Sequence, residues 1–167
     1  MNKLDFTRLA LVTFEGEFIA YYSVIGLAEL CFPSGRTTAI SNAAEISGQV
    51  REWHRLTAAA VKAILSGRTP TELPPLDVSR GTEFQQSVWR AMLQIKLGQT
   101  QSYGEIAAVI GNPKAGRAVG GACGANPIPL LVPCHRVLAA NQKIGGFSGG
   151  LAWKRKLLEM ENIRVTQ

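Results

Sequence analysis

The sequence predicts an α+β protein in which a small N-terminal α/β domain, residues 1–79, precedes a helical C-terminal domain, residues 80–167. Short β-branched and aromatic stretches fill the first third of the chain, whereas helix-start signals recur after residue 80. A proline- and glycine-rich segment, residues 67–81, lies between the two, and the balance of charge changes sign there. These observations indicate a linker between two parts of different architecture.

The N-terminal domain is expected to hold an antiparallel sheet and one helix. Residues 9–14 and 18–24 have the composition of strands, and the EGE sequence at residues 15–17 predicts a hairpin turn between them. Residues 26–32 predict a third strand, which the PSG sequence at residues 33–35 ends. Apolar positions in helical spacing predict a helix over residues 43–65, and Gly67 stops it.

Helices dominate the prediction for the C-terminal domain because it contains two capping boxes. Thr82 with Gln85, and Ser102 with Glu105, pair a hydroxyl with a side chain three residues later, which satisfies backbone donors at a helix start. The helix that starts at Ser102 is expected to run to residue 110.

A helix-turn-helix is predicted where that helix ends. The GNP sequence at residues 111–113 separates it from a further helix at residues 114–124. The second helix is rich in glycine and alanine, which weakens it as a helix. Close approach to a nucleic-acid backbone and tight packing against another helix explain the small side chains equally well.

The charge of the chain is unevenly distributed. Residues 1–79 carry seven Lys/Arg and eight Asp/Glu, whereas residues 80–167 carry eleven Lys/Arg and four Asp/Glu, so the +6 of the whole chain lies in the second half. A basic half beside a neutral half is typical of a protein that meets a polyanion. A solvated basic face without a partner explains the same numbers.

Composition and cysteine usage exclude several classes. Three widely spaced cysteines (Cys31, Cys123 and Cys134) make no disulfide framework, and two distant histidines give no metal-ligand spacing, so we expect no metal. No stretch is apolar enough for a membrane span, and the N-terminus does not resemble a secretory signal. The GGFSGG loop at residues 145–150 lacks a phosphate-loop pattern. We therefore expect a cytoplasmic, nucleoid-associated protein without a cofactor.

One short segment carries candidate chemistry. In the PCHRV sequence of residues 133–137, Cys134 stands beside His135 and Arg136, and such electropositive surroundings favour the nucleophilic thiolate. A cysteine in a sequence is more often an inert core residue, so the dipeptide alone leaves both interpretations open.

The wider pattern resembles the O6-alkylguanine-DNA alkyltransferases, also called methylated-DNA–protein-cysteine methyltransferases. The resemblance covers residues 81–161, about half of the chain. The similar segments are residues 81–89 (GTEFQQSVW), 98–104 (GQTQSYG), 111–120 (GNPKAGRAVG), 126–127 (NP), 132–137 (VPCHRV) and 145–150 (GGFSGG), together with Lys154 and Glu161. Residues 1–79 are similar only in general layout, as the variable N-terminal domain of the family would be.

The resemblance implies a role for each of five catalytic residues. Cys134 would accept the alkyl group, and His135 would take its proton through a water molecule while Glu161 orients the imidazole. Asn126 would brace the turn between the DNA-binding helices and the active-site segment. Tyr103 would crowd the target phosphate and donate a hydrogen bond to the leaving guanine.

The resemblance also implies a winged form of the helix-turn-helix that enters the minor groove and flips the damaged base out of the duplex. Arg117 would fill the gap left in the stack. Further expected substrate- or DNA-binding residues are Tyr103, Ala118, Gly120, Val137, Phe147, Ser148 and Lys154. The implied activity is direct reversal of damage: one irreversible transfer of a methyl or larger alkyl group from O6-alkylguanine in double-stranded DNA to Cys134. A monomer is implied, whereas activity on O4-alkylthymine and cooperativity on DNA stay open.

Three departures from the family pattern stand out. Phe147 occupies a position where tyrosine is common, which removes a hydroxyl near the base. Lys96 stands where proline is usual, which loosens the turn before Gly98. The N-terminal half lacks the zinc-binding Cys/His cluster of some members, so we expect Cys31 to be a core residue.

Three rival functions explain less of the sequence. A DNA-binding module without chemistry leaves Cys134, His135 and Glu161 without a purpose. Non-catalytic alkyltransferase-like proteins lack the acceptor cysteine, which is present in this chain. A thiol hydrolase would need an oxyanion hole, and no segment indicates one.

Overall fold

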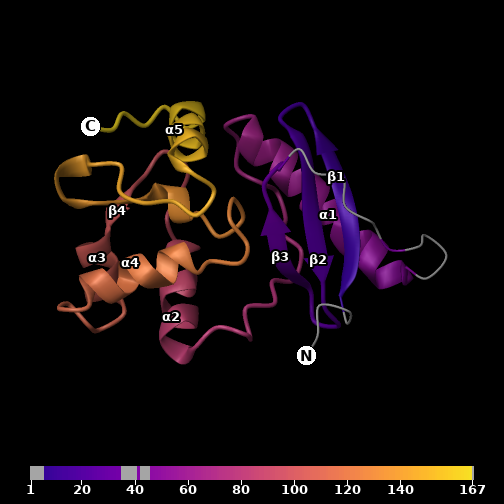
Figure 1. The fold of residues 1–167 in the computed structure, drawn as a ribbon, viewed down its shortest axis with the longest axis horizontal. Coiled ribbons are helices and arrows are strands. Elements are labelled where there is room, and N and C mark those ends of the chain that lie inside the picture. Colours follow the sequence, from indigo (N-terminus) through magenta and orange to yellow (C-terminus); the bar gives the residue numbers. More distant parts are fainter. Residues whose placement is uncertain (1–5, 35–40, 42–45, 167) are drawn as a thin grey trace.

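The N-terminal half is a three-stranded antiparallel sheet covered by one long helix (Figure 1). The computed structural model describes residues 6–34, 41 and 46–166. The strands β1 (Thr7–Thr13), β2 (Gly16–Tyr22) and β3 (Leu27–Cys31) lie in chain order, so the predicted hairpin and third strand are confirmed as elements. The bounds of the hairpin were wrong: its turn lies at residues 14–15 instead of 15–17, and its second strand spans 16–22 instead of 18–24. Residue 35, the last of the expected PSG turn, lies outside the described residues.

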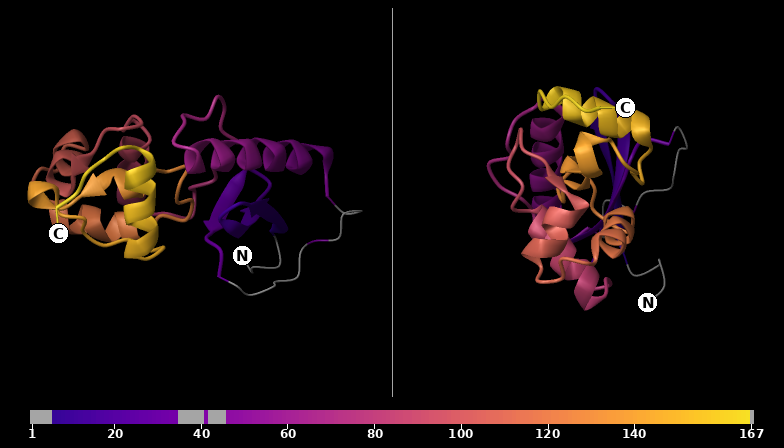
Figure 2. Two further views of the ribbon diagram at one scale, coloured as in Figure 1. Left: turned by 90° about the horizontal axis from the view of Figure 1, so that it is seen from above. Right: turned by 90° about the vertical axis from the view of Figure 1, so that its left-hand side faces the viewer.

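Helix α1 (Gly48–Leu65) crosses one face of this sheet, as the view from above in Figure 2 shows. The predicted apolar stripe is buried, from Val50 and Trp53 through Val61 to Leu65. The predicted start was too early, because the Ser47 side chain caps the helix by accepting a hydrogen bond from the Val50 N–H. Residues 43–45 of the predicted helix lie outside the described residues.

The segment between the halves is attached to the sheet. Leu27 donates its N–H to Pro75 and accepts from the Asp77 N–H, which gives a parallel bridge along the free edge of β3. Cys31, at the end of β3, is only half-buried, so its expected place in the core was wrong.

The described part of the C-terminal half contains four α-helices and two very short strands: α2 (Glu83–Met92), β4 (Gln101–Ser102), α3 (Tyr103–Val109), α4 (Gly116–Gly124), β5 (Val137–Leu138) and α5 (Leu151–Met160). Both predicted capping boxes form. Helix α4 begins two residues later than predicted, at Gly116, because a turn closed by the Ala115 N–H and the Asn112 carbonyl precedes it. Helices α2, α3 and α4 pack together, and the Trp89 indole N–H donates to the Ala122 carbonyl at 2.8 Å.

The hydrophobic core runs through both halves without a break. One cluster of buried residues includes Phe18 and Trp53 from the first half and Met92 and Cys134 from the second. The Leu30 N–H also donates to the Pro127 carbonyl at 2.9 Å, which ties β3 to the segment after α4. The predicted domain boundary between residues 1–79 and 80–167 therefore stays a prediction, because buried residues from both sides of it pack in one core. No helix within the described ranges is long and apolar enough to span a membrane.

A tight turn follows β5. Asn141 and Gln142 both have φ of 58°, and the Lys143 N–H donates back to the Ala140 carbonyl, as in a type I′ turn. The left-handed conformation is costly for a side chain with a Cβ atom, and glycine adopts it freely.

We expect Gln142→Gly to raise the free energy of unfolding by about 0.5 kcal/mol, since relief of the left-handed strain exceeds the added entropy of the unfolded chain. Ala140→Gly is the matched control: Ala140 is not among the residues with positive φ, so this variant should lower stability by about 0.5 kcal/mol. Urea unfolding measures both, and changes of the same sign would contradict the turn geometry.

Candidate active site

Cys134 begins a single 3-10 turn, Cys134–Arg136, directly after Pro133. Cys134 is buried, with 3% exposure, yet it lines a cavity of about 270 Å³. The other residues around this cavity are Tyr103, Gly120, Cys123, Gly124, Gly146, Phe147 and Ser148. Four of the predicted binding residues therefore surround the predicted nucleophile.

Asn126 ties this segment to the end of α4. Its side-chain N–H₂ donates to the Val132 carbonyl at 2.9 Å and to the Cys134 sulfur at 3.1 Å, and its Oδ1 accepts from the Ile128 N–H at 3.0 Å. A single buried amide thus fixes the loop before Cys134 and contacts the thiol itself. Burial raises the pKa of Cys134, while the Asn126 hydrogen bond and the Lys154 charge oppose that rise.

His135 and Glu161 form a buried pair. His135 is fully buried, and its Nε2 lies 2.9 Å from Glu161 Oε1. Its other ring nitrogen, Nδ1, has no hydrogen-bond partner among the described residues. Burial lowers the pKa of His135 although Glu161 opposes this, so the ring is neutral at pH 7. A neutral imidazole held on one side by a carboxylate can accept a proton on the other.

Arg136 is part of the same network, a role that the sequence analysis missed. Its guanidinium donates Nε and Nη2 to the Glu161 carboxylate at 2.8–3.1 Å and Nη1 to the Ile95 carbonyl at 2.6 Å. Burial alone would raise the pKa of Glu161, but the bonds and charges of His135 and Arg136 outweigh burial and lower it to about 2. The sequence offered one signal for this role of Arg136, its position directly after Cys134 and His135. We interpreted that position only as electropositive surroundings for the thiol.

Lys154 is fully buried, unlike a typical DNA-binding lysine. Its ammonium donates to the Val137 carbonyl at 2.7 Å and to the Gly146 carbonyl at 3.2 Å. Burial lowers its pKa to about 8, and its interactions with Cys134 and Cys123 work against that shift. Lys154 therefore holds the loop at residues 145–150 and places a positive charge near the thiol.

That loop is shaped by glycines. Gly145 and Gly150 have φ of +64° and +88°, a region that residues with a side chain rarely adopt. The Gly150 N–H donates to the Phe147 carbonyl, which turns the loop into α5. Phe147 is half-buried and Ser148 is exposed, and both line the cavity from this side.

The remaining predicted residues lie around α4 and β5. Arg117 and Ala118 are exposed on α4, whereas Gly120 reaches the cavity. Val137 is fully buried in β5 and does not line the cavity, which leaves it no direct contact there. Cys123 was not predicted: it is a second buried thiol at the cavity, and burial raises its pKa to about 12.

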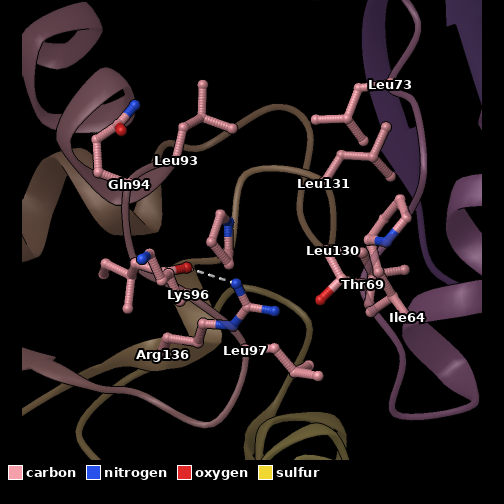
Figure 3. Close-up of a pocket in the computed structure, with 13 residues that line it drawn as sticks. Ile64, Thr69, Leu73, Leu93, Gln94, Lys96, Leu97, Leu130, Leu131 and Arg136 are labelled. Carbon is pink, nitrogen blue, oxygen red and sulfur yellow. Dashed lines mark hydrogen bonds between the residues drawn. The ribbon is translucent and has the colours of Figure 1, made fainter.

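A larger cavity of about 690 Å³ lies between the two halves (Figure 3). Leu73 and Ile64 form one side, Leu93 forms the other, and the Arg136 guanidinium reaches in beside its hydrogen bond to Ile95. No cysteine, histidine or carboxylate lines it. The smaller cavity at Cys134 is therefore the candidate for chemistry.

Comparison with known proteins identifies the family of the chain. The 6-O-methylguanine DNA methyltransferase family matches through its DNA binding domain over residues 83–163. The methylated-DNA–protein-cysteine methyltransferase of Mycobacterium tuberculosis is 56% identical over 97 residues, which cover 56% of this chain and 59% of that protein. The sequence match thus covers less than two thirds of the length of this mycobacterial relative. A protein of the same name from Methanosarcina acetivorans is 49% identical over 113 residues, 66% of this chain and 70% of that protein.

Solved structures extend the likeness to the N-terminal half. Mycobacterium tuberculosis OGT in complex with DNA is 37% identical with a TM-score of 0.72, and the match covers 91% of this chain and 90% of that one. The O6-methylguanine-DNA methyltransferase of Pyrococcus kodakaraensis, 23% identical with a TM-score of 0.63, shares the fold over 95% of this chain and 99% of that one. The expected α+β class agrees with these structures. On the sequence and structural matches together, the chain belongs to the family of methylated-DNA–protein-cysteine methyltransferases.

Proposed function

We propose that this protein repairs double-stranded DNA by a single irreversible transfer of an alkyl group from guanine O6 to the sulfur of Cys134. The observation that carries the proposal is the position of Cys134: a buried thiol on a cavity of about 270 Å³, beside a histidine–glutamate pair. A cavity of this size is at the small end of ligand pockets and suits one base. Membership of the family supports the same chemistry.

The reaction forms one bond and breaks one. The Cys134 thiolate attacks the alkyl carbon, a C–S bond forms, and the bond from that carbon to O6 breaks. The thiol proton passes to His135 Nδ1 through a water molecule, and the electron pair of the broken bond stays on the guanine. Tyr103 donates a hydrogen bond to this anion, which then takes up a proton from water. The product thioether is stable, and no second group in the proposal removes the alkyl group, so each molecule acts once.

The unpaired Nδ1 of His135 supports this relay. Because Nε2 faces the Glu161 carboxylate, an imidazolium formed at Nδ1 would be stabilised by a charge already in place. The lowered pKa of His135 keeps the ring neutral, and so able to accept a proton, at neutral pH. Lys154 offers the complementary charge to the thiolate.

On the DNA side, we propose that α3 and α4 form a helix-turn-helix, with the turn after β5 as its wing, and that α4 enters the minor groove. The exposure of the small residues on α4 supports this. Ala122 is buried beneath Trp89, which packing explains, whereas Ala118, Gly121 and Gly124 are exposed. Small exposed residues allow a helix to approach a nucleic-acid backbone, and the flipped base would then enter the cavity at Cys134.

Cys134→Ser should abolish transfer and leave duplex binding nearly unchanged, because a hydroxyl is a far weaker nucleophile and the exposed face of α4 is untouched. Mass spectrometry after incubation with O6-benzylguanine should find one benzyl group on Cys134 of the wild type and none on the variant. A benzyl adduct on another residue, Cys123 included, would contradict the proposal.

His135→Ala should slow transfer about 100-fold at pH 7, within the usual range for loss of a general base. The two proteins should also differ in pH dependence. The pKa of His135 lies below its usual value, so the wild-type rate should not fall as pH drops from 8 to about 6.5. The variant relies on direct ionisation of a thiol whose pKa is raised, so its rate should fall about tenfold per pH unit over the same range. Parallel pH profiles would rule out the relay.

Arg117→Ala should impair repair of duplex DNA by about 100-fold while leaving reaction with free O6-benzylguanine nearly unchanged, since only the duplex requires base extrusion, which costs a few kcal/mol. Lys114→Ala is the matched control, because Lys114 is exposed just before α4. Each variant should reduce the salt dependence of duplex binding by about one counterion, but only Arg117→Ala should lose repair. Equal losses on both substrates would place Arg117 in the active-site scaffold instead.

A further inference from the structure

Four aromatic rings connect the N-terminal sheet with the loop that lines the Cys134 cavity. Phe32 packs edge-on against Phe147, with ring centroids 5.8 Å apart, and lies 4.8 Å from the ring of Trp153 on α5. Phe18 contacts both Phe32 at 5.7 Å and Trp153 at 5.8 Å. Such tilted and edge-on pairs at 4.5–7 Å are the favoured geometry for aromatic side chains.

The sheet side of this cluster is firmly anchored. Phe18 is fully buried in the middle of the hairpin, where β2 pairs with β1. Phe32 directly follows β3, whose Leu30 N–H is bonded to the Pro127 carbonyl of the C-terminal half. Phe32 is therefore attached to a strand that contacts from both halves hold in place.

The loop side is in close contact with the same ring. A Cβ atom built on Gly149 would lie 2.5 Å from Phe32 Cε2 and 2.9 Å from Phe147 Cε1, so the loop backbone fits against both rings without room for a side chain. Phe147 in turn lines the cavity that holds Cys134. One aromatic ring thus separates Phe32 from the space that the base would occupy.

We propose that Phe32 is a positioning residue for the alkylated base. It fixes the Phe147 ring as a wall of the cavity and thereby makes the N-terminal half part of the substrate site. This inference rests on the function proposed above. Since Phe147 has no hydroxyl to hold it by a hydrogen bond, ring packing from behind is what orients it. Binding of a base with a large aromatic substituent depends most on such a wall.

Phe32→Ala tests the inference, with Phe32→Tyr as the conservative variant that keeps the ring and Phe32→Leu as a milder one in case the alanine variant unfolds. Leu9→Ala is the control, because it removes core packing from β1, where Leu9 pairs with Ala20, and leaves the four aromatic rings in place. Reaction rates with O6-benzylguanine, measured over a range of concentrations, separate the half-saturating concentration from the maximal rate. Labelling of Cys134 by iodoacetamide reports the thiol without a base.

We expect Phe32→Ala to raise the half-saturating concentration of benzylguanine about tenfold, with the maximal rate and iodoacetamide labelling nearly unchanged. Phe32→Tyr should restore the wild-type value, and Leu9→Ala should not alter it. A normal half-saturating concentration in Phe32→Ala, or an equal rise in Leu9→Ala, would overturn the inference. A wild-type protein that gains no benzyl group would instead overturn the proposed function, so the two failures are distinguishable.

Discussion

The buried carboxylate of Glu161 holds together the segments that build the reactive site. Glu161 lies at the end of α5, and its carboxylate is hydrogen-bonded to the His135 ring and to the forked guanidinium of Arg136. It also accepts a longer hydrogen bond, of 3.4 Å, from the Gly98 N–H. The Arg136 guanidinium also donates a hydrogen bond to the carbonyl of Ile95, in the segment after α2. Removal of the carboxylate would leave a buried guanidinium without its counter-charge, which is strongly destabilising. Glu161 therefore has a structural role in addition to its contact with His135.

Burial sets the main electrostatic problem of the site. It raises the pKa of Cys134 and lowers that of His135, so it disfavours both the thiolate and the imidazolium that the proposed transfer creates. Two charged groups oppose these effects of burial: Lys154 lies near the sulfur, and Glu161 is hydrogen-bonded to the imidazole. Each lies on the side where the opposite charge develops, so the protein need not reorganise during the reaction. Because the pKa of Lys154 is about 8, its assistance weakens in alkaline solution.

Local signals in the sequence predicted the elements that depend on neighbouring residues. Thr82 and Ser102 cap their helices as expected, because a capping box needs only residues three apart. The start of α4 was misplaced, since Ala115 provides no such signal. Arg136 escaped notice because its partners, Ile95 and Glu161, are 41 and 25 residues away. The left-handed turn at residues 141–142 was equally hidden, since neither residue is glycine.

The same limit explains why the sequence indicated no role for the N-terminal half. Its strands gave no motif, and the similarity that predicted the site begins only at residue 81. Phe18, Phe32, Phe147 and Trp153 come together from positions spread over 135 residues, so no spacing could have indicated their contact. Yet the core crosses the linker, and the ring that lines the cavity packs against the sheet. A C-terminal half alone would lack Phe18 and Phe32, so the side of Phe147 that packs against Phe32 would be exposed to water. The residues of the proposed reaction lie in one half of the chain, and the shape of the cavity depends on both halves.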